Sequence, residues 1–157
     1  MGDKGRTERH YLEEELYERV RTDPVIFDFL QAGSLDGLWY WDLENREHEW
    51  MSARFKEVFG YRDDEVPHRA EWWQQHIFEE DLPAVFSNFE RHLADPSYPY
   101  DQVIRYRHRD GSTVWIRCRG IVLRDDEGRP HRMLGAHTNV TSLMRSRERL
   151  ASLVEGR

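Results

Sequence analysis

The run YDQVIRYRHRDGSTVWIRCRG, residues 100–120, decides the fold class. Apolar and polar residues alternate on both sides of Asp110 and Gly111, which is typical of β-strands with one buried face. A glycine in the second turn position adopts positive φ without strain, so the pair predicts a tight hairpin that fixes the register of two long strands. A third strand-like run, HRMLGAHTNVT at 131–141, follows the turn signal DDEGRP.

Two more strands and three helices are expected upstream of this hairpin. LWYWDL at 38–43 alternates in the same way, and a turn leads from it into HEWMS at 48–52, so the two form a second hairpin. Helical spacing of apolar residues predicts helices within 52–61, 70–78 and 79–96. The predicted fold is therefore α+β, with a five-stranded antiparallel sheet and helices on one face.

Both ends of the chain are predicted to be helical. Residues 6–21 form an amphipathic helix, and Pro24 and Gly33 mark the first position and the end of a second, shorter helix. The apolar stripe of the first helix consists of Tyr11, Leu12, Leu16 and Val20. We therefore expect an N-terminal helical extension over 1–33, a sheet domain over 34–142, and a C-terminal helix over 143–157.

Composition excludes several classes of function. The net charge of −7 and the pI near 5.6 disfavour a nucleic-acid surface, which needs clustered Lys and Arg. The single cysteine, Cys118, excludes an internal disulfide and a cysteine-rich zinc site. No segment approaches eighteen apolar residues, and MGDKGRTERH lacks a signal-peptide core. We expect a cytoplasmic segment without membrane contact.

No motif predicts catalysis or a metal site. The chain has no glycine-rich phosphate loop, nucleophile elbow or HExxH sequence, so we expect it not to be an enzyme. The acids Glu79, Glu80 and Asp81 precede a helix and are interpreted as capping its N-terminus. His131 and His137 are six residues apart on one strand, about 20 Å at strand rise, which is too far for one ion.

Four motifs together resemble a known family. WMSARFKEVFGY, IFEEDLP, YDQVIRYRHRDGSTVWIRCRG and RPHRMLGAHTNVT occur in the order and spacing of a PAS domain with its C-terminal PAC portion. The resemblance covers about residues 30–143 and is closest to bacterial sensor proteins. It implies a sensory, signal-transducing input domain whose parent protein carries an output domain, such as a diguanylate cyclase or the histidine kinase of a two-component system.

Strand parity predicts an aromatic interior. If Ile116 and Cys118 face inward, Arg117 and Arg119 reach solvent on the other face. The predicted lining consists of Trp39, Trp41, Phe55, Phe59, Val85, Phe89, Ile104, Tyr106, Ile116, Cys118, Met133 and His137. This interior is either a filled core, in which Tyr106 and His137 bond to each other or to backbone, or a small-molecule cavity. Titration of His137 near neutrality is a third option.

No cofactor is firmly predicted, although the resemblance leaves haem and flavin open. Haem-binding relatives take an axial histidine from the long helix, and His92 lies near the polar end of that helix. The photoactive light-oxygen-voltage branch needs a cysteine on a helix, whereas Cys118 lies on a predicted strand. The alternatives to a ligand-binding module are therefore a cofactor-bound redox or gas sensor and a ligand-free dimerisation module.

Roles are also expected for the last strand, from the resemblance, and for the first helix, from its apolar stripe. Asn139 and Thr141 stand where the family usually has Asp and Ser or Thr, at the junction with the exit helix. A short polar side chain there caps the helix, and we expect this junction to relay the signal. We also expect a homodimer, because the apolar stripe of the first helix has to be covered.

Overall fold

The computed structural model describes residues 10–156, apart from the side chains of 32–34. The described chain divides into two units, one that ends at Ser34 and one that begins at Leu35. In the part that the structure describes, no helix is long and apolar enough to cross a bilayer.

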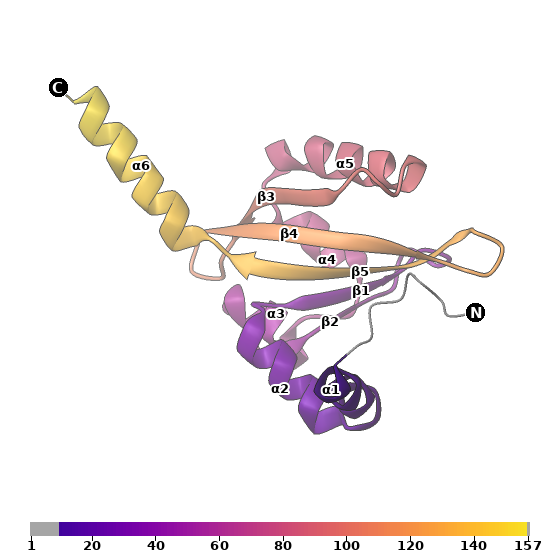
Figure 1. The fold of residues 1–157 in the computed structure, drawn as a ribbon. Coiled ribbons are helices and arrows are strands. Elements are labelled where there is room, and N and C mark those ends of the chain that lie inside the picture. The colour runs from indigo at the N-terminus through magenta and orange to yellow at the C-terminus, as the bar shows by residue number, and fades with distance from the viewer. Residues whose placement is uncertain (1–9, 157) are drawn as a thin grey trace. The chain divides into compact units, whose positions relative to one another are not determined.

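The second unit is built on one antiparallel sheet (Figure 1). Its strands are β1 (Leu38–Asp42), β2 (Glu49–Met51), β3 (Tyr100–Arg107), β4 (Thr113–Arg124) and β5 (Pro130–Asn139), in the order β2-β1-β5-β4-β3. Helices α3 (Ala53–Val58), α4 (Ala70–His76) and α5 (Leu82–Ala94) supply side chains to the core on one face. The predicted α+β fold is confirmed.

The hairpin of β3 and β4 forms as expected. Its strands pair from Tyr100 with Gly120 to Arg107 with Thr113, which fixes the register over the whole length of β3. Gly111 has φ of +89°, a conformation that glycine adopts without a steric penalty. The Asp110 carboxylate accepts a hydrogen bond from the Ser112 amide at 2.8 Å, so the turn is stabilised locally.

The helices over the sheet begin in different ways. Ser52 precedes α3, and its Oγ accepts hydrogen bonds from the amides of Phe55 and Leu38, so it ties the helix to β1. A 3-10 turn, Glu79–Asp81, leads into α5.

The expected capping by Asp81 is wrong. Its side chain makes no cap bond and instead pairs with Arg105 on β3, where Nη2 lies 2.7 Å from Oδ1 and the amide 2.9 Å from Oδ2. A charge-assisted, two-point pair is stronger than a dipole interaction at a helix start.

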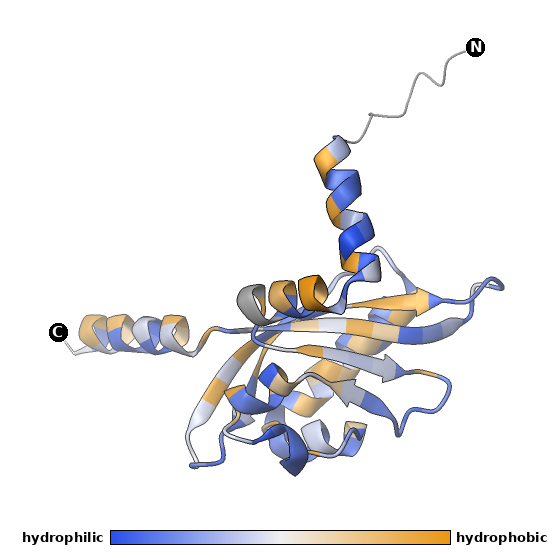
Figure 2. Cartoon of the chain, turned by 90° about the horizontal axis from the view of Figure 1, so that it is seen from below, coloured by the Kyte–Doolittle hydropathy of each residue, from blue (hydrophilic) through white to orange (hydrophobic). Residues whose placement is uncertain are grey.

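The terminal helices are amphipathic, and none of their described side chains is buried. Helix α1 spans Tyr11–Thr22, and the predicted start at residue 6 lies outside the described residues. Helix α2 spans Pro24–Ser34, with the Asp23 carboxylate accepting from the Val25 amide at 3.0 Å. Helix α6 (Thr141–Glu155) begins two residues earlier than predicted, and apolar residues alternate with polar ones along it (Figure 2).

Candidate functional site: an aromatic cavity and the junction to the exit helix

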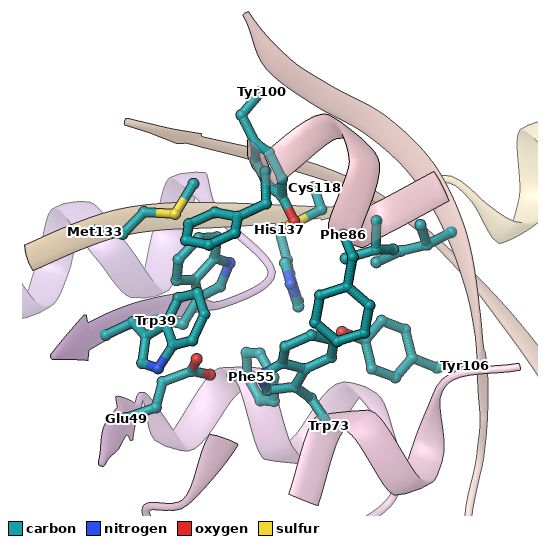
Figure 3. Close-up of a pocket in the computed structure, with 14 residues that line it drawn as sticks. Trp39, Glu49, Phe55, Trp73, Phe86, Tyr100, Tyr106, Cys118, Met133 and His137 are labelled. Atoms are coloured by element: carbon teal, nitrogen blue, oxygen red, sulfur yellow. The ribbon is translucent and has the colours of Figure 1, made fainter. Parts of the chain in front are cut away.

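A small cavity lies between the inner face of the sheet and the helices α4 and α5. Its volume is about 30 Å³, which is room for about two water molecules. The lining consists of Trp39, Trp41, Glu49, Phe55, Trp73, Val85, Phe86, Phe89, Tyr100, Ile104, Tyr106, Cys118, Met133 and His137 (Figure 3). All but two of the residues predicted from the sequence are in this set. Phe59 and Ile116 are fully buried in the core and do not line the cavity.

Four lining residues were missed by the sequence analysis, namely Glu49, Trp73, Phe86 and Tyr100. Tyr100 has the same strand parity as Ile104, and Phe86 adjoins Val85 on its helix, so the periodic pattern contained both. Glu49 has the parity of Met51 on β2, but acids are rarely buried, so its inward position is not expected from residue type. Helical spacing predicts a helix around Trp73 but not the direction of its side chain.

The floor of the cavity is shaped by glycines. Gly135 on β5 is the direct Cα partner of Trp39 on β1 and, on its other side, of Gly120 on β4. A Cβ atom on Gly135 would lie 1.8 Å from Cε2 of Trp39, so the indole lies against bare backbone. The Trp39 ring then reaches Tyr100 edge-on, with 6.3 Å between the ring centroids. The two glycines therefore allow one tryptophan to cover the centre of the sheet.

Glu49 is the acidic group of the cavity. It is 3% exposed, and its carboxyl accepts a hydrogen bond from the Trp73 side chain. Burial raises the pKa of this carboxyl from 4.5 to about 8, and the bond from Trp73 offsets only part of that effect. Glu49 is therefore mostly protonated at neutral pH.

His137 is the second polar group, and it is neutral. Its ring stacks on Phe55 with 4.6 Å between centroids, and burial lowers its pKa to about 3. Titration near neutrality is therefore wrong for this site. Nδ1 is buried without a hydrogen-bond partner among the described residues, an arrangement that costs about 1–3 kcal/mol. Figure 3 shows the ring and the Glu49 carboxyl both directed into the space enclosed by aromatic side chains.

Neither haem nor flavin fits these residues. The nitrogens of His92 are both occupied, since Nδ1 lies 2.6 Å from the Tyr98 carbonyl oxygen and Nε2 accepts from the Val122 amide at 3.1 Å. Cys118 lies on β4, and burial raises the pKa of its thiol to about 12, so it does not supply a thiolate for an adduct. A volume of about 30 Å³ is also far below the roughly 300–1,000 Å³ of usual ligand pockets.

Metal-binding clusters are likewise not found in the described part of the chain. No group of three or more His, Cys, Asp or Glu side chains there is placed to hold an ion. His131 and His137 differ in their surroundings as well as their position, since His131 pairs with Glu44 and His137 faces Phe55.

The junction between β5 and α6 is a hydrogen-bonded cluster. The Asn139 side-chain oxygen accepts from the Thr141 amide at 3.0 Å, and the Thr141 hydroxyl oxygen accepts from the Trp115 amide on β4 at 3.0 Å. The N-cap position itself is Val140, so Asn139 stabilises the first turn from one residue earlier. Helix α6 is thereby attached to two adjacent strands.

The same cluster includes the segment that precedes β1. The Asp36 carboxylate accepts from the Asn139 amide at 2.7 Å and pairs with Arg54 of α3 at 3.2 Å. The backbone of His137 donates to the Gly37 carbonyl at 2.9 Å and accepts from the Asp36 amide at 3.0 Å. His137 in the cavity and Asn139 at the junction are therefore two residues apart and bound to one short segment.

Residues 48–137, more than half of the chain, match the family model of the PAS fold. This chain belongs to the PAS family. The resemblance to a PAS domain and the α+β fold expected from the sequence are confirmed. No curated protein sequence matches the chain.

Solved structures of sensor proteins share the PAS fold of this chain. A sensory box histidine kinase/response regulator from Burkholderia thailandensis is 31% identical, with a TM-score of 0.70 over 83% of this chain and 95% of that chain. The N-terminal domain of a diguanylate cyclase with PAS/PAC sensor from Marinobacter aquaeolei is 20% identical, with a TM-score of 0.60 over 69% and 97%. A light-oxygen-voltage domain studied with a flavin analogue is 21% identical, with a TM-score of 0.59 over 87% and 99%. The last two show the fold alone.

Proposed function

We propose that this PAS chain is the non-catalytic input module of a cytoplasmic, multidomain signalling protein, and that it senses a small molecule in the aromatic cavity. The resemblance to a sensory box histidine kinase supports a linked output domain, either a histidine kinase or a diguanylate cyclase. The observation that carries the proposal is the position of His137, which faces the cavity and lies two residues before the junction.

The route of the signal follows the hydrogen bonds of the junction. A ligand that bonds to Nδ1 of His137 satisfies a buried polar atom and changes the stacking of its ring on Phe55. The His137 backbone passes that shift to Asp36, which holds the Asn139 amide. Asn139 and Thr141 then alter the first turn of α6. Relay in this sense requires two states of the junction with different ligand affinity.

Hydrogen exchange of α6 tests this relay. With a ligand identified from a metabolite library by thermal shift, we expect amide exchange in the first turn of α6 to change in the wild type. The change is lost in Asn139→Ala, because the bond to the Thr141 amide is removed. Ser146→Ala, on the exposed side of α6, is the matched control. A ligand that binds while exchange in α6 stays constant would contradict the relay, and a library without any binder would favour a dimerisation module.

We also propose that the chain is a homodimer, assembled through the stripe of α1. Tyr11, Leu12 and Leu16 are at least half exposed and Val20 is partly exposed, so the stripe is free to pack on a second copy. The double substitution Leu12→Glu with Leu16→Glu should yield a monomer in analytical ultracentrifugation, whereas Glu14→Gln should leave the mass unchanged. A dimer that survives the double substitution would exclude this interface.

A further inference from the structure

Acidic and basic side chains are not balanced in the lining of the cavity. Among the residues that the structure places in its lining, Glu49 is the one acid and none is Lys or Arg. His137 stays neutral because it is buried. Ionised Glu49 therefore has a hydrogen bond from Trp73 but no positive charge in the lining to oppose it. A buried carboxylate without a counter-charge is strongly destabilised, and a bound cation would remove that penalty.

The walls of the cavity suit a cation as well. Trp39, Trp41, Trp73 and Tyr100 all contribute to the lining next to Glu49. The face of an indole or phenol ring attracts ammonium groups through its quadrupole, and the attraction is stronger where water is excluded. Aromatic rings around one acid form the type of site that recognises amines and methylated ammonium groups.

We infer that the cavity binds the ammonium head of a small organic amine, with the Glu49 carboxylate as its counter-ion and tryptophan rings as its walls. This inference rests on the proposed sensing function and names its ligand class. The present volume of about 30 Å³ accepts a head of about two heavy atoms, such as methylammonium. Phe86 lines the cavity and is 41% exposed, so its rotation would admit more highly methylated heads.

A structural role for Glu49 at the sheet edge is the competing explanation. Inward-pointing charges on edge strands prevent pairing with other chains, and β2 is an edge strand. The backbone donors of β2 are already occupied, however, because the Glu49 amide donates to the His68 carbonyl at 3.3 Å and the Met51 amide to His68 Nδ1 at 3.2 Å. The backbone donors of β2 are thus occupied without the Glu49 carboxyl. We therefore assign the role of this carboxyl to the cavity.

Other charged groups near Glu49 lie outside the lining. The Arg46 guanidinium is 5.5 Å from the centroid of the Phe89 ring. His48, His68 and Arg132 border a second groove that Glu49 also borders, and none of these three residues is in the lining of the cavity. Tyr100, Tyr106 and Cys118 face Glu49 from β3 and β4, and burial raises the pKa of each. Glu49 is thus the group that ionises in the cavity near neutrality, so cation affinity should rise with pH up to about 8.

Titration with simple ammonium ions tests the inference. The full chain is titrated with methylammonium and tetramethylammonium chloride at constant ionic strength, and with methanol and tert-butanol as uncharged counterparts, while tryptophan fluorescence and melting temperature are recorded. We expect saturable binding of an ammonium ion that strengthens from pH 6 to about 8. It should be at least about tenfold weaker in Glu49→Gln. Glu47→Gln, on the exposed turn before β2, is the matched control.

Three results would overturn the inference. They are equal binding of the alcohols, wild-type affinity in Glu49→Gln, and no saturable response to either ammonium ion. If the alcohols bind as tightly as the ammonium ions, the cavity is still a ligand site, and the proposed sensing function is not contradicted. A missing response would remove the amine as ligand, while the metabolite screen and α6 exchange would decide the sensing function separately. Circular dichroism establishes that Glu49→Gln, which keeps the side-chain shape, is folded.

Discussion

Gly135 is the single residue on which the geometry of the cavity floor depends most. The indole of Trp39 occupies the space that any side chain at 135 would need. Gly120 is less constrained, since a Cβ there would lie 3.0 Å from Met133 Cε, the end of a flexible side chain, and 3.0 Å from Trp39 Cη2. The two glycines are therefore not equivalent, although they are direct Cα partners.

We predict that Gly135→Ala lowers the free energy of unfolding by about 3 kcal/mol, because overpacking forces Trp39 out of position. Gly120→Ala should cost less, because its Cβ would lie 3.0 Å from Met133 Cε and Trp39 Cη2 and 3.2 Å from the Leu134 carbonyl oxygen, contacts that small shifts relieve. Urea denaturation measures both. In the background of Trp39→Leu the effect of Gly135→Ala should shrink, and a double-mutant cycle without such coupling would refute the contact.

Between elements, the Asp81–Arg105 pair joins the start of α5 to β3. The guanidinium bonds lower the pKa of the Asp81 carboxyl and keep it ionised. Arg105 also lies over the Phe78 ring, with 4.6 Å from its guanidinium carbon to the centroid. The pair thus fixes the helix that carries Val85, Phe86 and Phe89 relative to the sheet.

Asp81→Ala should lower the free energy of unfolding by about 2 kcal/mol, the usual loss for a partly buried, charge-assisted hydrogen bond. Asp81→Asn should lose less, because its amide oxygen still accepts from the Arg105 backbone. Thermal denaturation at neutral pH compares these with Glu79→Gln, an exposed neighbour. Equal stability of Asp81→Ala and the wild type would show that the pair does not secure α5.

The elements themselves could be predicted from the sequence because each has a local signal. Alternation predicted the strands, Pro24 predicted the first position of the second helix, and Gly111 predicted the hairpin turn. The role of Asp81 could not be obtained in this way, nor could the hydrogen bond to the Glu49 carboxyl, although strand parity places Glu49 on the same face as Met51. Both depend on a partner far away in the sequence, Arg105 for Asp81 and Trp73 for Glu49. A local sequence pattern carries no information about such partners.

For the whole molecule, two buried groups give stability opposite dependences on pH. The folded protein holds the Glu49 proton more tightly than the unfolded chain, so stability falls as pH rises from 4.5 to about 8. The folded protein binds a proton at His137 less tightly, so stability falls as pH drops from 6.5 to about 3. The two slopes cancel between 4.5 and 6.5, where we expect maximum stability.

Denaturation by urea across this range measures the prediction. Relative to the plateau, the loss between pH 6.5 and about 8 and the loss between pH 4.5 and about 3 should each be about 2 kcal/mol, because only this part of each window lies outside the overlap. Glu49→Gln should abolish the loss at alkaline pH and keep the loss at acid pH, whereas Glu47→Gln should keep both. If the wild type is as stable at about pH 8.5 as at about pH 5.5, the pKa of the Glu49 carboxyl is not raised in the folded protein.

The strand order also has a consequence for how the chain is made. The central strand of the sheet, β5, is the last one to be synthesised, and it separates β1 from β4. The bond from Asn139 to Asp36 spans 103 residues of sequence. Such non-local pairing slows folding, because the entropy of loop closure is lost before the contacts form. During synthesis on the ribosome, the aromatic side chains of β1 therefore have no partner strand until nearly the whole domain has emerged. Aggregation of the chain is most favoured during this interval.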